Sequence, residues 1–202
     1  MHDNAMTTEE MLYLKRVNLA PYIQLATALV GKSRYGGSNM FRHQLDTMAV
    51  LIDYGYLDSV LLKAAIVHDL LEDVPDFNHN VLLLADYEGH VVYELVQEVT
   101  RVPSVPKHEF LSHILENGSQ NAKVLKVADR ISNMVSLGFV NKMDFIKRYT
   151  DETETHVFPI AKLVNKSMLE ELQSLVKSRR KYFADFEKIR VDAMPTDSTQ
   201  FL

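Results

Sequence analysis

The stretch Lys63-Ala64-Ala65-Ile66-Val67-His68-Asp69-Leu70-Leu71-Glu72-Asp73-Val74 passes from an apolar run into a cluster of one imidazole and three carboxylates. On a helix, Glu72 follows His68 by one turn, and Asp73 follows Asp69 by one turn. The apolar lead-in predicts a helix that enters a core, where unpaired charge is costly. A cation, a proton or solvent must offset that charge, and an adjacent His-Asp pair supplies two ligands for a divalent metal. From this stretch alone, an amphipathic helix with a solvated acidic end is the alternative.

The composition predicts one globular domain spanning residues 1–202. Hydrophobic residues make up 47% of the chain, and only 7 glycines and 6 prolines argue against an all-β protein. Because the sequence has no cysteine, any metal must be held by His, Asp or Glu. No signal peptide and no apolar run of about 20 residues is present, so we expect a cytoplasmic protein without a membrane partner. A net charge of −5 argues against a nucleic-acid polymer as partner, but not against a small anionic ligand.

Helical patterns and capping residues follow one another along the chain, without strand-period alternation, and predict an all-α fold. Asp58 is the expected N-cap of the central helix, and Ser119 that of the helix carrying Asp129. The apolar spacing within 167–190 predicts a helix that belongs to the core or forms a subunit interface, which leaves a homo-oligomer open. Residues 194–202 read as a frayed tail. The expected helices cover about 8–19, 21–31, 41–54, 59–74, 79–86, 88–100, 107–116, 120–138, 141–164 with an interruption near Pro159, and 167–190.

Two further residues extend the metal hypothesis beyond the central helix. His43 precedes His68 on a separate predicted helix, and Asp129 follows an apolar run on a third. Alone, such a histidine is usually a satisfied core residue, and such an aspartate is usually part of a helix ion pair. Together with His68 and Asp69 they form a four-ligand set of nitrogen and oxygen donors from three helices, each beside an apolar run.

This pattern resembles the HD superfamily of metal-dependent phosphohydrolases, and more narrowly the RelA/SpoT hydrolase domain and the stand-alone small alarmone hydrolases, over roughly residues 20–165. Residues 126–134, Lys-Val-Ala-Asp-Arg-Ile-Ser-Asn-Met, are similar to the family's Lys-x-Ala-Asp-Arg-x-x-Asn-Met, and 148–161 resemble its Arg-x-x-x-Glu-Thr…Pro-x-Ala segment. The pair Glu72-Asp73 matches hydrolysis-competent members, and Arg34 stands where the family places an arginine against the guanine ring. Two places depart from the family pattern. The family usually has Pro-Tyr-x-x-His-Pro, whereas residues 39–44 read Asn-Met-Phe-Arg-His-Gln, and Tyr35 follows Arg34 where a basic residue is usual.

The resemblance implies an HD-domain helical bundle that hydrolyses the 3′-pyrophosphate of guanosine tetra- or pentaphosphate, giving GDP or GTP and pyrophosphate in the stringent response. The implied metal, most simply Mn²⁺, has as ligands His43, His68, Asp69 and Asp129. Glu72 and Asp73 are the implied catalytic pair that orients a water and accepts its proton. The implied substrate-binding residues are Arg34, Lys107, Lys126, Asn133, Ser136 and Arg148. The alternatives are an HD phosphohydrolase acting on a deoxynucleoside monophosphate or cyclic nucleotide, and a non-catalytic nucleotide-binding module.

Overall fold

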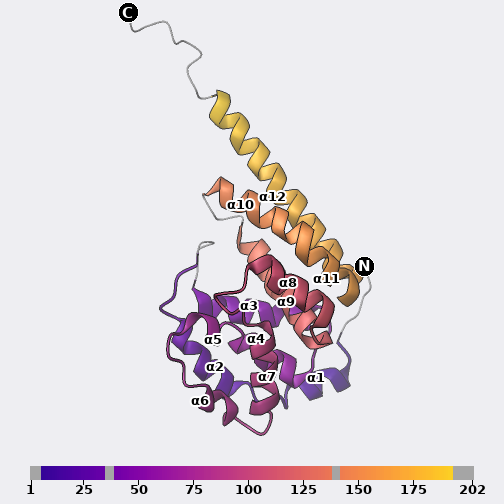
Figure 1. The fold of residues 1–202 in the computed structure, drawn as a ribbon. Coiled ribbons are helices and arrows are strands. Elements are labelled where there is room, and N and C mark those ends of the chain that lie inside the picture. Colours follow the sequence, from indigo (N-terminus) through magenta and orange to yellow (C-terminus); the bar gives the residue numbers. More distant parts are fainter. Residues whose placement is uncertain (1–5, 35–38, 138–141, 193–202) are drawn as a thin grey trace, which may run out of the picture.

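The computed structural model describes residues 6–34, 39–137 and 142–192, and it confirms the all-α fold (Figure 1). Within those ranges the sole β-type pairing is an isolated bridge between Ser33 and Asn39. The predicted frayed tail, 194–202, lies outside them. The elements in chain order are α1 Thr8–Leu14, α2 Ala20–Ala26, the 3₁₀ turn η1 Thr27–Leu29, α3 Met40–Asp53, α4 Ser59–Val67, α5 Leu70–Asp73, α6 His79–Leu83, α7 Gly89–Val99, α8 Lys107–Asn117, α9 Gln120–Ser136, α10 Met143–Glu152, the π-helical turn η3 Thr153–Val157, α11 Phe158–Val164 and α12 Lys166–Asp192.

Helix α4 is the buried centre of the molecule. Asp58 caps it as predicted, its side chain accepting a hydrogen bond from the backbone N–H of Leu61 at 2.9 Å. Every residue in 61–67 is buried, so the helix is apolar on all sides except at Lys63. It contacts α2, α3, α7 and α9, which fixes the position of the His-Asp pair that follows it.

The predicted continuous helix over 59–74 is wrong at its middle, because α4 ends at Val67 and α5 begins at Leu70. The His68 ring donates a hydrogen bond from Nδ1 to the Ala65 carbonyl at 2.8 Å. In an unbroken helix that carbonyl would accept the backbone N–H of Asp69 instead. The break therefore lies at the two residues predicted to bind a metal.

Helix α9 is the second central element and contacts α3, α4, α7, α8, α11 and α12. Ser119 caps it as predicted, by accepting from the backbone N–H of Ala122 at 3.1 Å. Because α9 crosses the same core as α3 and α4, it brings Asp129 next to residues about 60 and 86 positions earlier in the chain.

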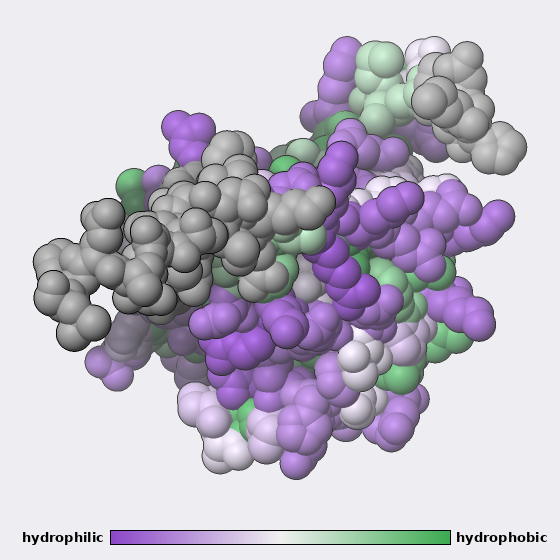
Figure 2. All heavy atoms as spheres, turned by 90° about the horizontal axis from the view of Figure 1, so that it is seen from above, coloured by the Kyte–Doolittle hydropathy of each residue, from purple (hydrophilic) through white to green (hydrophobic). Residues whose placement is uncertain are grey.

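Helix α12 lies against α9, α10 and α11 and extends past them out of the bundle (Figure 1). Met168, Leu172 and Val176 are buried, so this part of the predicted 167–190 helix belongs to the core. Its first turn is capped by Asn165, whose side-chain oxygen accepts from the backbone N–H of Ser167 at 2.8 Å. Viewed from above, hydrophilic side chains dominate the coloured surface, with only scattered hydrophobic ones (Figure 2). Across the described residues, no helix combines the length and apolar character needed to cross a bilayer.

Candidate active site

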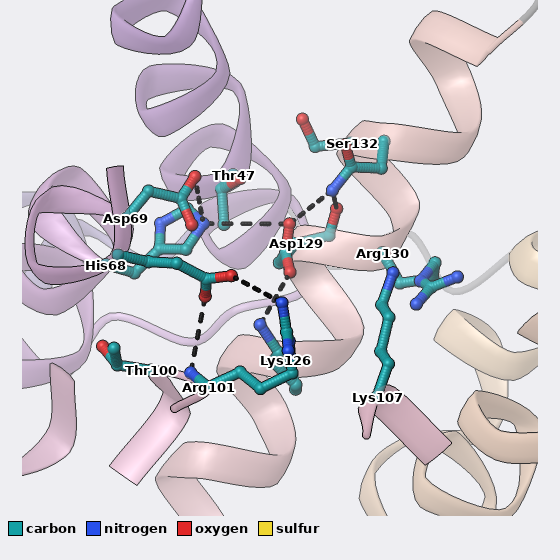
Figure 3. Close-up of polar contacts among 12 residues, drawn as sticks. Thr47, His68, Asp69, Thr100, Arg101, Lys107, Lys126, Asp129, Arg130 and Ser132 are labelled. Atoms are coloured by element: carbon teal, nitrogen blue, oxygen red, sulfur yellow. Dashed lines mark hydrogen bonds and ion pairs between the residues drawn. The ribbon is translucent and has the colours of Figure 1, made fainter. Parts of the chain in front are cut away.

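Three helices bring the four predicted metal ligands together. His43 lies on α3, His68 and Asp69 at the break after α4, and Asp129 on α9. One potential ligand atom from each of His43, His68 and Asp69 lies within 4.8 Å of the other two. Asp129 Oδ1 is 3.1 Å from His43 Nε2 and 3.7 Å from His68 Nε2. Figure 3 shows the His68 ring in contact with the carboxylates of both Asp69 and Asp129. His43 Nε2 lies close to the same two carboxylates.

The His68 ring presents a free nitrogen to these carboxylates. Since a carbonyl only accepts, the contact with Ala65 fixes the proton of the neutral ring on Nδ1 and leaves a lone pair on Nε2. This Nε2 is buried and has no hydrogen-bond partner, and it lies 3.3 Å from Asp69 Oδ2. Burial alone would lower the pKa of His68, but the carboxylates of Asp69 and Asp129 raise it above its ordinary value. A buried lone pair facing two carboxylates fits a divalent cation, with a proton as its competitor.

Asp129 is held in its ionised form. Burial would raise its pKa, but the Lys126 ammonium, together with the neighbouring His43 and His68 rings, keeps the pKa well below its usual range. Lys126 Nζ lies 3.2 Å from Asp129 Oδ2, and Asn133 Nδ2 donates to Asp129 Oδ1 at 2.5 Å. An ionised carboxylate that is oriented by neighbouring donors has the properties of a metal ligand.

His43 is oriented from α9 and by its own helix. Its Nδ1 lies 2.9 Å from Ser132 Oγ, and Thr47 Oγ1 donates to the His43 carbonyl at 2.9 Å. The Ser132 contact leaves His43 Nε2 directed at the two carboxylates, 3.6 Å from Asp69 Oδ2. Ser132 was missed from the sequence, although its place within the matched 126–134 segment was a usable signal.

A cavity of about 320 Å³ opens onto this cluster, a size within the usual range of small-ligand pockets. It reaches three of the four predicted ligands, His43, Asp69 and Asp129, whereas His68 is not among its lining residues. Both predicted catalytic carboxylates, Glu72 and Asp73, also line it. Its other lining residues are Ser33, Arg34, Met40, Arg101, Lys107, Phe110, Leu111, Lys126, Arg130, Asn133, Ser136, Leu137, Phe145, Tyr149 and Val157.

The two carboxylates lie in different electrostatic surroundings. Burial raises the pKa of Asp73, and the negative charges of Asp69 and Glu72 raise it further. Glu72 instead faces a cation: its Oε1 lies 3.7 Å from an Arg101 guanidinium nitrogen, and its Oε2 accepts the Arg101 backbone N–H at 3.4 Å. Arg101 is a cavity residue that was missed from the sequence. The signal was its place directly after Thr100, where the resembled family has a Val-Thr-Lys step.

A group of cations and an aromatic ring occupies the side of the cavity formed by α8, α9 and α10. Arg130 lies 4.2 Å from the centre of the Tyr149 ring, and Lys107 lies 5.0 Å from it. Both cations share Glu152, at 2.6 Å from Arg130 and 3.0 Å from Lys107. Arg130 also donates to Thr153 Oγ1 at 2.9 Å, in the π-helical turn η3. Figure 3 shows Lys107 and Arg130 together at this side of the site. Their contacts with Glu152 orient both cations.

The remaining predicted substrate contacts divide into two sets. Arg34 NH2 donates to Asn133 Oδ1, which joins the guanidinium to α9 across the cavity. Ser136 also lines the cavity, with its hydroxyl donating to the Asn133 carbonyl at 3.0 Å. Arg148, by contrast, is exposed on α10 and is not among the cavity residues, so the structure does not bring it to the others.

Comparison with known proteins gives relatives of one kind. No family model matches the chain. A protein of Mycoplasma genitalium named probable guanosine-3′,5′-bis(diphosphate) 3′-pyrophosphohydrolase is 28% identical over 138 residues, which are 60% of this chain and 19% of that protein. The guanosine-3′,5′-bis(diphosphate) 3′-pyrophosphohydrolase MESH1 of Mus musculus is 32% identical over 105 residues, 50% of this chain and 57% of that protein. The chain thus spans less than two thirds of the length of either relative.

The fold has a solved counterpart. A structure described as a metazoan ortholog of SpoT that hydrolyses ppGpp and plays a role in starvation responses aligns with a TM-score of 0.66 and 22% identity. The alignment covers 87% of this chain and 98% of that one. The predicted resemblance is therefore confirmed: the chain is similar in sequence to the guanosine-bis(diphosphate) 3′-pyrophosphohydrolases and has the all-α fold of a ppGpp-hydrolysing SpoT ortholog.

Proposed function

We propose that this chain is a metal-dependent hydrolase that removes the 3′-pyrophosphate from guanosine tetra- or pentaphosphate, giving GDP or GTP and pyrophosphate. A single cavity holds both a His/Asp cluster and five described cations, and this supports the substrate class most directly. A nucleotide with two pyrophosphate groups carries dense negative charge, which such a cavity complements. The relatives named as 3′-pyrophosphohydrolases support the choice of this nucleotide over others.

In this proposal, His43, His68, Asp69 and Asp129 hold one divalent cation, most simply Mn²⁺. When bound, such a cation lowers the pKa of a water and offsets charge on the phosphoryl group. Mixed nitrogen and oxygen donors suit a transition metal better than Ca²⁺ or Mg²⁺, which prefer oxygen ligands alone.

The chain's own carboxylates then handle the proton. Asp73 is the better proton acceptor, because its raised pKa brings it nearer to neutral pH, where a general base is most effective. Glu72 orients the attacking water and is itself fixed by Arg101. Asp73 would later give its proton to solvent or to the leaving nucleotide oxygen, which completes the cycle.

The cations bind and orient the phosphates. Lys107, Arg130 and Lys126 line the cavity and would bind the 3′-pyrophosphate, which is released when its bond to the ribose 3′-oxygen breaks. Arg34 would contact the purine, with Asn133 as its anchor on α9. Positioning of this kind supplies much of the rate enhancement in phosphoryl-group reactions.

The test is product analysis with the purified chain, ppGpp and Mn²⁺. We expect equimolar GDP and pyrophosphate by anion-exchange chromatography, and loss of turnover on metal removal. Asp69→Ala should abolish turnover, whereas Asp46→Ala, at an exposed aspartate of α3, should keep it.

Two other results would contradict the proposal. Turnover of deoxynucleoside monophosphates or cyclic nucleotides, with ppGpp left intact, would favour an HD phosphohydrolase of another specificity. Tight ppGpp binding by a folded, metal-loaded protein without any product would favour a nucleotide-binding module.

A further inference from the structure

The residue after His43 makes a contact that the family pattern does not predict. Gln44 is fully buried on α3, and its Nε2 donates a hydrogen bond to Asp69 Oδ2 at 2.8 Å. The resembled family usually has proline at this position, and proline has no side-chain donor. Gln44 Oε1 is buried without a hydrogen-bond partner among the described residues. A buried amide that is only half satisfied costs stability, so an apolar side chain of the same size would suit the core better.

The orientation of the Asp69 carboxylate depends on this contact. Asp69 occupies the N-cap position of α5, where an aspartate normally bonds to the free backbone N–H groups of the first turn. Its side chain makes no such capping bond here. Among the described residues, Gln44 supplies its one side-chain hydrogen bond, on the oxygen that faces His43 and His68. Without the Gln44 amide, rotation of Asp69 to cap α5 would turn that oxygen away from the histidines.

We propose that Gln44 is a positioning residue, which holds the Asp69 carboxylate toward the two histidines and thereby sets the affinity for the divalent cation. The inference rests on the metal site of the proposed function, but not on which nucleotide is hydrolysed. Outer partners of this kind typically change metal affinity about 10–100-fold when they are removed. The half-satisfied amide is retained, in this view, for metal binding rather than for folding.

The experiment is calorimetric titration of Mn²⁺ into the metal-free chain without nucleotide, beside urea unfolding of the same samples. For Gln44→Leu we expect a Kd raised about 10–100-fold, with the stability of the metal-free protein unchanged or higher. Gln44→Met, which keeps an unbranched side chain of similar length, should behave in the same way and serves if the leucine variant folds poorly. As a matched control, Thr150→Val removes another buried polar group, on α10, whose hydroxyl donates to the Lys147 carbonyl and not to a candidate ligand, and it should leave Kd within about twofold.

A double-variant measurement separates positioning from a general loss of structure. In an Asp69→Ala background, Gln44→Leu should have no further effect on Kd, because the side chain that Gln44 orients is gone. Equal Kd for wild type and both Gln44 variants would overturn the proposal, as would a loss of metal-free stability that matches the loss of affinity. Absence of Mn²⁺ binding by the wild-type chain would overturn the metal-dependent function itself, whereas Mn²⁺ binding without ppGpp hydrolysis would leave the Gln44 result interpretable.

Discussion

The buried ammonium of Lys63 gives the sharpest stability prediction. Lys63 is 1% exposed on α4, and its Nζ lies 2.6 Å from Asp86 and 2.5 Å from Glu88. Lys63→Met leaves both carboxylates without their cation, and breaking a buried pair in this way costs about 3–5 kcal/mol. The low end, about 3 kcal/mol, applies here, because Asp86 keeps a hydrogen bond from the Tyr22 hydroxyl and Glu88 keeps one from Ser59. For a protein of this size, that corresponds to a Tm lower by about 6–12 °C.

Urea unfolding followed by the helical circular dichroism signal measures this loss. Lys162→Met, at an exposed lysine of α11, should change the free energy of unfolding by less than about 0.5 kcal/mol. Neutralising the partners as well, in Lys63→Met with Asp86→Asn and Glu88→Gln, should recover much of the loss, because no unpaired charge remains. A loss below about 1 kcal/mol for the single variant would refute this reasoning, since that is the range of a solvent-exposed pair. A triple variant no more stable than the single one would refute it too.

Three further predictions concern the metal, the backbone and the substrate. Because the pKa of His68 is raised, protons compete with the metal for its ring nitrogen. The Mn²⁺ affinity measured by calorimetry should therefore fall as the pH is lowered from about 8 to 6. An affinity that does not change with pH would exclude His68 as a ligand. Gly89→Ala should lower the free energy of unfolding by about 1–3 kcal/mol, because the added Cβ would lie 2.5 Å from a backbone carbonyl oxygen of α6. Gly31→Ala is the control and should cost little, since a Cβ added there has no atom within 4 Å. Arg34→Ala should raise KM for ppGpp about 10–100-fold, as expected for loss of a charged hydrogen-bond donor. Arg148→Ala, at a residue outside the cavity, should leave KM unchanged. Equal effects of the two variants would contradict the position of Arg34 inside the cavity and of Arg148 outside it.

Much of the fold followed from local sequence signals. Apolar spacing and caps such as Asp58 and Ser119 act within a few residues, so they are readable without a tertiary structure. The continuous helix through 59–74 was the main error. Its break depends on the His68 ring competing for a backbone carbonyl, a contact that helical periodicity does not encode.

The sequence by itself determined which residue types were available for chemistry: a His/His-Asp/Asp set, a Glu-Asp pair and no cysteine. These are chemical identities, and their spacing within one helix needs no folding information. Only the tertiary structure decided which cations face the metal-ligand set: Arg101, which follows α7, and Lys107, at the start of α8, line the cavity, whereas Arg148 is exposed and does not line it. It likewise revealed Gln44 behind Asp69, because a contact between two helices depends on how they cross, and no local pattern specifies that crossing.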